Sequence, residues 1–70
     1  MLMLDVVGLD EQEALNQIRK FCFIQYLSYS ITYKESSEYE EGKVIKTIPA
    51  AGEHYNDGDV IHIVLSKGNN

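Results

Sequence analysis

Residues 49–68 read PAAGEHYNDGDVIHIVLSKG, and this stretch decides most of the fold. It holds the only proline of the chain, three of its five glycines and both histidines. Strict alternation predicts a strand over about 60–66. Its expected core face carries Ile61, Ile63 and Leu65, and its other face carries Val60, His62 and Val64. The Asp-Gly pair at 57–58 predicts a turn before this strand, because glycine adopts positive φ at low cost.

Two further strands are expected before this stretch. From residue 23 to residue 33, apolar residues recur at every second position, which is typical of a half-buried strand. The residues on its expected core face are Leu27, Tyr29, Ile31 and Tyr33. A short strand at 43–48 ends at Pro49, and the acidic residues 34–42 predict a loop between the two strands.

An amphipathic helix is expected ahead of the strands, over about residues 11–21. Asp10 is a favourable N-cap residue, and Glu13, three residues later, completes a capping-box pattern. Acidic residues lie in the first turn and basic residues in the last turn, which suits the helix dipole. The apolar stripe expected to face the sheet is Ala14, Leu15, Ile18, Phe21 and Cys22.

These elements predict an α+β fold, in which one α-helix packs on a three-stranded, mainly antiparallel β-sheet. Antiparallel neighbours are favoured because the connections are of tight-turn length. A chain of 70 residues forms one small domain, which buries roughly 60% of the surface that the unfolded chain exposes. A deep catalytic cavity is difficult to build at this size, whereas a sheet surface is an easier platform for a ligand.

The charge balance argues against several classes of partner. Eleven acidic and six basic residues give a net charge of −5, which disfavours nucleic acid, because binding to its phosphates depends on Lys and Arg. The same charge disfavours anionic lipid surfaces. The sequence has no run of roughly 20 apolar residues, so direct membrane insertion is not expected. Short exposed strands and the apolar run at 21–27 leave a weak homodimer open.

The motifs predict no catalytic residue, metal site or cofactor. His54 and His62 lie on either side of the expected turn, and no further ligands are seen to converge on them. The acids around Gly58 lack the spacing and the terminal glutamate of a calcium loop. Cys22 is the only cysteine, so no internal disulfide forms, and its place at a helix end indicates packing. Nucleophile-elbow, P-loop and dinucleotide-binding motifs are absent from the sequence.

Five side chains are candidates for ligand binding. Tyr39 and Tyr55 fall in expected loops, where a tyrosine ring can stack on a sugar or anchor a partner. Arg19, Lys43 and Lys46 are the cations that could meet a ligand carboxylate. Each type also has a structural interpretation: a tyrosine can cover the edge of the sheet, and lysines on an edge strand discourage pairing between chains.

The order of these motifs resembles the PASTA domain, the penicillin-binding protein and serine/threonine kinase associated domain. The resemblance rests on an entry and helix start at 5–15 (DVVGLDEQEAL), GKVI at 42–45, PAAG at 49–52, and Gly58 followed by an alternating strand and Ser-Lys-Gly at 66–68. It covers residues 4–68 as a single domain, with residues 1–3 and 69–70 as expected flexible ends.

The resemblance implies a non-catalytic extracellular module that faces the cell wall of a Gram-positive-type bacterium, as part of a membrane-anchored protein. Its parent would be a penicillin-binding protein, which is a transpeptidase, or a Ser/Thr kinase. Its ligand would be a peptidoglycan fragment (a muropeptide) or a β-lactam. A ligand carboxylate would meet Arg19, Lys43 or Lys46, while Tyr39 or Tyr55 covers sugar or peptide. The alternative is a structural spacer or docking module that binds no muropeptide.

Overall fold

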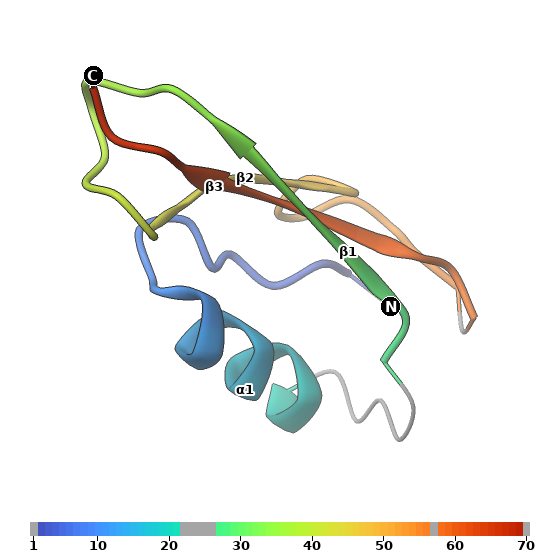
Figure 1. The fold of residues 1–70 in the computed structure, drawn as a ribbon. Helices are drawn as coiled ribbons and strands as arrows, with labels where there is room; N and C mark the ends of the chain where they lie inside the picture. Colours follow the sequence, from blue (N-terminus) through green and yellow to red (C-terminus); the bar gives the residue numbers. More distant parts are fainter. Residues whose placement is uncertain (1, 22–26, 57, 70) are drawn as a thin grey trace.

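The computed structural model describes residues 2–21, 27–56 and 58–69. Its elements run in the order α1 (Glu11–Phe21), β1 (Tyr29–Lys34), β2 (Val44–Ile48) and β3 (Ile61–Ser66). The strands form one sheet, and α1 lies across one face of it (Figure 1). The predicted fold class, one helix on a three-stranded sheet, is confirmed. The expected strand start at 23–26, the predicted packing role of Cys22 and the first residue of the Asp-Gly pair lie outside the described residues.

The sheet is mixed, with β3 in the centre and the strand order β1-β3-β2. β2 pairs with β3 in the expected antiparallel direction. β1 pairs with β3 in parallel, with Tyr29 opposite Ile61 and Lys34 opposite Ser66, so the expectation of a mainly antiparallel sheet is wrong for this pair. A parallel pair requires a long connection between its strands. Residues 35–60 supply it here, because they include β2 and return the chain to the end of the sheet where β1 begins.

A hydrophobic core lies between α1 and the sheet, as the apolar patterns predict. The helix contributes Ala14, Leu15 and Ile18, and none of these side chains is more than 7% exposed. Their partners in the same cluster include Ile61, Ile63 and Leu65 of β3. The face of β3 that the alternation predicts to be buried is therefore the face that packs toward the helix.

The N-terminal segment adds to this core. Met3 is 3% exposed, and its N–H donates to the Glu53 carbonyl at 2.8 Å. The Met3 carbonyl in turn accepts from the Gly52 N–H at 2.8 Å. Burial and two backbone hydrogen bonds therefore attach Met3 to the loop between β2 and β3.

The start of α1 follows the predicted cap. Asp10 Oδ1 accepts from the Glu13 N–H at 2.8 Å, which satisfies one of the N–H groups that a helix leaves without a partner in its first turn. Glu11 and Glu13 lie in the first turn, and Arg19 and Lys20 lie in the last, so the charges complement the helix dipole. The predicted bounds and cap of the helix are confirmed.

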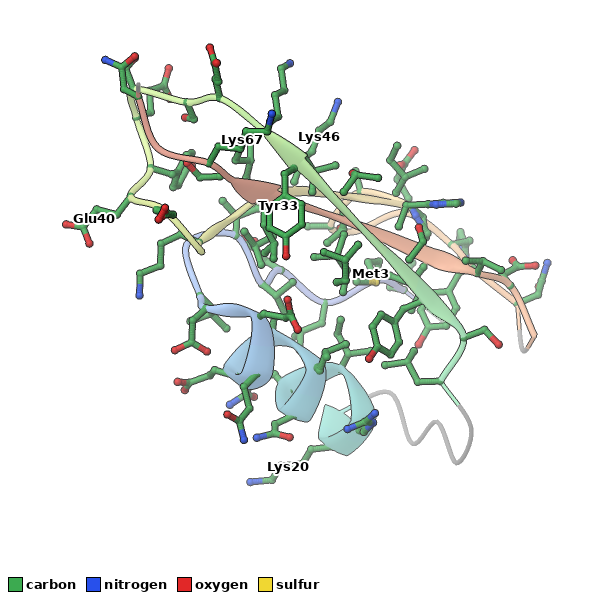
Figure 2. The ribbon with its side chains drawn as sticks, viewed as in Figure 1. Met3, Lys20, Tyr33, Glu40, Lys46 and Lys67 are labelled. Atoms are coloured by element: carbon green, nitrogen blue, oxygen red, sulfur yellow. The ribbon has the colours of Figure 1, made fainter. Side chains whose placement is uncertain are left out.

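The tyrosines of β1 differ from the sequence-based expectation. Alternation predicts Tyr29 and Tyr33 on the buried face, yet they are 40% and 58% exposed. The ring of Tyr33 points toward the helix layer (Figure 2), and Ile31 between the two tyrosines is half-buried against the core. The tyrosines stay accessible because β1 is an edge strand, where the helix and β3 cover only part of each side chain.

A turn precedes β3, as the sequence predicts. Gly58 has a φ of +92°, in the left-handed region that glycine adopts without steric cost. The Asp59 N–H donates to the Asn56 carbonyl at 3.1 Å, and the Asn56 N–H donates to Asp59 Oδ2 at 3.0 Å. The turn interpretation of this segment is therefore confirmed. β2 ends at Ile48 as expected, and the peptide bond to Pro49 is cis.

The domain is elongated, with principal extents of 37 × 18 × 17 Å. Leu2 forms an isolated antiparallel bridge with His54 at the end of the sheet where β3 begins. At the other end, beyond the last residue of β3, the Gly68 carbonyl accepts from the Ser36 N–H at 3.2 Å. The two ends of the described chain therefore lie at opposite ends of the long axis (Figure 1).

Candidate functional site

The face of the sheet opposite α1 is a candidate binding surface. Its residues alternate along each strand with the core residues, and the cross-strand register arranges them in rows. The two complete rows are Ser30–His62–Ile48 and Thr32–Val64–Lys46. Ile48, His62 and Lys46 are exposed, and Val64 in the middle is 8% exposed. The surface is therefore mostly polar, with a shielded apolar centre at Val64 and an exposed apolar side chain at Ile48.

Three lysines gather on this open face, toward the end where β3 finishes. Lys46 and Lys67 both point away from α1 (Figure 2). Lys34 follows Thr32 in the alternation of β1, and its carbonyl accepts from the Lys67 N–H at 2.9 Å. All three lysines are exposed. We call Lys34, Lys46 and Lys67 the lysine cluster, of which the sequence predicts only Lys46 as a site residue.

Lys34 and Lys67 were missed by the sequence reasoning for different reasons. The signal for Lys34 was present, because Ser30, Thr32 and Lys34 share the polar face of the predicted strand. Lys67 follows the last strand directly and becomes a neighbour of Lys34 only through the parallel pairing of β1 with β3. An antiparallel pairing of these strands would have placed the two lysines at opposite ends of the sheet.

Tyr39 and Lys43 are held next to each other by Ser66. Ser66 Oγ donates to the Tyr39 carbonyl at 2.8 Å, and the Ser66 N–H donates to the Lys43 carbonyl at 2.8 Å. Ser66 is fully buried, whereas Tyr39 and Lys43 are half-buried. The structure therefore brings these two predicted site residues to the end of β3 that also carries the lysine cluster.

The other two predicted site residues lie elsewhere. Arg19 is exposed on the last turn of α1, so it belongs to the helix layer, on the opposite side of the sheet from Lys46. Tyr55 is 5% exposed and belongs to the core cluster. The expectation of an accessible ring at Tyr55 is wrong, because the segment between β2 and β3 directs this side chain into the core.

An open groove lies at the other end of the sheet, where β3 begins. Its volume is about 510 Å³, and its lining residues are Ile48, Pro49, Glu53, His54, Tyr55, Asp59, Val60 and His62. Both carboxylates already serve the turns that form the groove. Glu53 Oε1 accepts from the Ala50 N–H at 2.8 Å, and Asp59 Oδ2 accepts from the Asn56 N–H at 3.0 Å. These acids therefore have a structural role in the loop between β2 and β3.

Among residues 2–21, 27–56 and 58–69, no three His, Cys, Asp or Glu side chains form a group that could hold a metal ion. His54 pairs through its backbone with Leu2, and His62 lies on the open face of β3 beside Ser30. Over the same described ranges, no helix combines the length and the apolar character needed to cross a bilayer.

Comparison with known proteins adds a family and two solved structures. The profile of the PASTA domain matches residues 2–67, whereas no curated protein gives a significant match. The crystal structure of the three-PASTA-domain region of a Ser/Thr kinase from Staphylococcus aureus matches with a TM-score of 0.82 and 33% sequence identity. That match covers 99% of this chain and 33% of the kinase chain.

The second solved structure is the entire extracellular region of the Ser/Thr kinase PrkC, also from Staphylococcus aureus. It matches with a TM-score of 0.80 and 35% identity, over 94% of this chain and 22% of that one. The chain described here therefore spans no more than a third of the length of either structure.

Proposed function

The chain belongs to the PASTA domain family, and on that basis we propose that it is a non-catalytic, extracellular module of a membrane-anchored bacterial Ser/Thr kinase that binds peptidoglycan fragments. The observation that carries the proposal is the match of 99% and 94% of the chain to the PASTA region and extracellular region of such kinases. Because both are kinases, they favour a kinase over a penicillin-binding protein as the parent. The 33% coverage of a three-domain region corresponds to one module.

The proposed binding surface consists of the lysine cluster together with Tyr39 and Lys43. Muropeptides carry carboxylates on their stem peptides, and lysine ammonium groups bind carboxylates through charge-assisted hydrogen bonds. The half-buried ring of Tyr39 offers an apolar surface to a sugar or peptide. Arg19 and Tyr55 are left out of this surface because of their positions on the helix layer and in the core.

The surface is an open sheet face, so the expected affinity is low. A ligand on such a face keeps much of its own surface in water, whereas a ligand in a pocket buries most of it. We expect a dissociation constant of about 0.1–1 mM for a single muropeptide on a single domain. Several linked modules would raise the effective affinity for a polymer such as peptidoglycan, because later binding events become intramolecular.

Titration of the isotopically labelled domain with a muropeptide, followed by backbone amide chemical shifts, tests this function. We expect saturable shifts at Lys34, Lys46, Lys67 and Tyr39, and a roughly tenfold weaker affinity in Lys46→Gln/Lys67→Gln, which removes two charge pairs. Arg19→Gln removes a charge from the helix layer and should leave the affinity unchanged. A β-lactam titrated in parallel tests that ligand class. Flat responses to both ligands at millimolar concentration would reject recognition.

A structural spacer is the second candidate function, and one observation favours it. The domain is elongated, at 37 × 18 × 17 Å, and the described chain ends lie at opposite ends of its long axis (Figure 1). Such modules can be linked end to end and extend a receptor by their length. For a pure spacer, both titrations stay flat, while small-angle scattering from two linked copies shows a rod with about twice the length of one domain.

A further inference from the structure

The edge of the sheet at β2 is protected against pairing. The Gly8 N–H donates to the Val44 carbonyl at 2.9 Å, and the Val44 N–H donates to the Leu9 carbonyl at 2.8 Å. The register of β2 with β3 is irregular between Val44 and Lys46, and Pro49 follows the strand directly. Covering segments, irregularities, lysines and prolines all discourage an edge from pairing with another chain.

Within the part of the chain that the structure describes, the edge of the sheet at β1 carries only one of these features, a lysine at its last position. The strand reads YSITYK, and its only charged residue is the last one. Its register with β3 is regular along its whole length. Tyr29 and Tyr33 leave large aromatic surfaces accessible, at 40% and 58% exposure. A regular edge strand with exposed apolar side chains and few charges is a site at which another strand can add.

The hydrogen bonds to β3 determine which backbone groups β1 directs outward. The Ser28 carbonyl accepts from the Ile61 N–H at 3.0 Å, and the Lys34 carbonyl accepts from the Lys67 N–H at 2.9 Å. In a parallel pair, residues that bond to the neighbouring strand alternate with residues whose N–H and C=O both point the other way. The residues that direct both groups away from β3 are therefore Tyr29, Ile31 and Tyr33.

We propose that β1 is a self-association edge, which pairs in the antiparallel direction with β1 of a second copy, so that Ile31 lies opposite Ile31 of the second copy. In this register Tyr29 lies opposite Tyr33 of the second copy, and the two-fold axis generates the reverse pair. All of these are hydrogen-bonded pairs, in which facing residues exchange both N–H···O=C bonds. Each outward N–H and C=O of the three residues then has a partner, and two sheets become one.

The side chains and charges agree with this register. Facing tyrosines form cross-strand aromatic pairs, which are favourable in antiparallel sheets. The last turn of α1, with Arg19 and Lys20, lies at the same end of the domain as the start of β1 (Figure 1). In an antiparallel pair, Glu35, which follows β1 in one copy, approaches this basic end of the other copy. A second copy is therefore an occupant that matches the edge in backbone, side chains and charge.

Sedimentation equilibrium of the 70-residue chain tests the self-association. We expect the average mass to rise with concentration, with a dissociation constant of about 0.1–1 mM, because one strand pair buries little surface. Dilution should shift the amide resonances of Tyr29, Ile31 and Tyr33, a result that requires no variant. If the average mass stayed that of the monomer at all concentrations up to about 1 mM, the proposal would be overturned. An interface of the expected strength would give a measurable dimer fraction at that concentration.

Charge-swapped variants test the register itself. Tyr29→Lys/Tyr33→Lys and Tyr29→Glu/Tyr33→Glu each place like charges opposite one another, so each variant alone should be monomeric. An equimolar mixture places a lysine opposite a glutamate in every such pair and should restore the dimer. Native-like amide spectra of both variants are the control for folding, which we expect because both tyrosines are exposed. A mixture of folded variants that stays monomeric would overturn the register centred on Ile31.

Discussion

Ser30 and His62 face each other across the parallel pair of β1 and β3, and Ser30 Oγ lies 2.7 Å from His62 Nδ1. This hydrogen bond links an edge strand to the central strand on the open face of the sheet. His62 is exposed, so water competes for both partners and the net stabilisation is modest. The bond helps to align the edge strand that carries Lys34 and the exposed tyrosines.

The contribution of this bond can be isolated by a pair of isosteric substitutions. Ser30→Thr keeps the hydroxyl, whereas Ser30→Val replaces it with a methyl group on an equally β-branched side chain. We expect the free energy of unfolding of Ser30→Val to be lower than that of Ser30→Thr by about 0.5–1 kcal/mol. Urea denaturation at neutral pH measures both. Equal stabilities would show that the hydroxyl makes no net contribution.

The N-cap of α1 is a second point at which one side chain affects stability. Asp10→Ala removes the acceptor for the Glu13 N–H and should lower the free energy of unfolding by about 1 kcal/mol. Asp10→Ser restores an N-cap acceptor and should recover most of the loss. Gln12→Ala, on the exposed side of the first turn, is the matched control and should stay within about 0.5 kcal/mol of the parent. A loss in Gln12→Ala as large as in Asp10→Ala would contradict the cap.

Much of this fold could be predicted from sequence because its signals are local. The cap at Asp10 and the stripe through Ile18 belong to one helix, and the alternation of Ile61 with His62 belongs to one strand. Patterns of this kind depend on neighbours a few residues apart, so they are readable without knowledge of the tertiary structure. The direction of β1 relative to β3 is different, because it depends on the route of the whole connection between them.

The candidate site shows the same limit. Lys46, expected in a short strand, is exposed on the open face of the sheet. Arg19 lies on the helix layer instead, because the sequence alone does not show on which side of the sheet the helix packs. Tyr55 was expected in an exposed loop and lies in the core, since loop side chains have no periodicity that indicates burial. Tyr33 has the predicted face but is exposed, because alternation does not distinguish an edge strand from a central one.

The core between α1 and β3 should be sensitive to loss of volume. Ile18 is fully buried, so Ile18→Ala should lower the free energy of unfolding by about 2–5 kcal/mol, and Ile18→Val by about 0.5–1.5 kcal/mol. A domain of 70 residues has a total free energy of unfolding of roughly 3.5–10 kcal/mol. The alanine variant therefore loses a large part of the stability of the domain. Thermal and urea denaturation measure both variants. If Ile18→Ala lowered the free energy of unfolding by less than Ile18→Val does, the packing described would be contradicted.

Ser66 should be the residue on which the order of the Tyr39–Lys43 segment depends most directly. Its buried hydroxyl donates to the Tyr39 carbonyl at 2.8 Å and accepts from the Gly68 N–H at 2.9 Å. Ser66→Ala removes both contacts at a site without solvent access, so we expect a loss of about 1–3 kcal/mol in the free energy of unfolding. Hydrogen exchange should accelerate at the Gly68 amide, whose acceptor is the missing hydroxyl. Ser37→Ala, at an exposed position of the same loop, should change neither quantity. Unchanged exchange at Gly68 in Ser66→Ala would show that another group holds this amide.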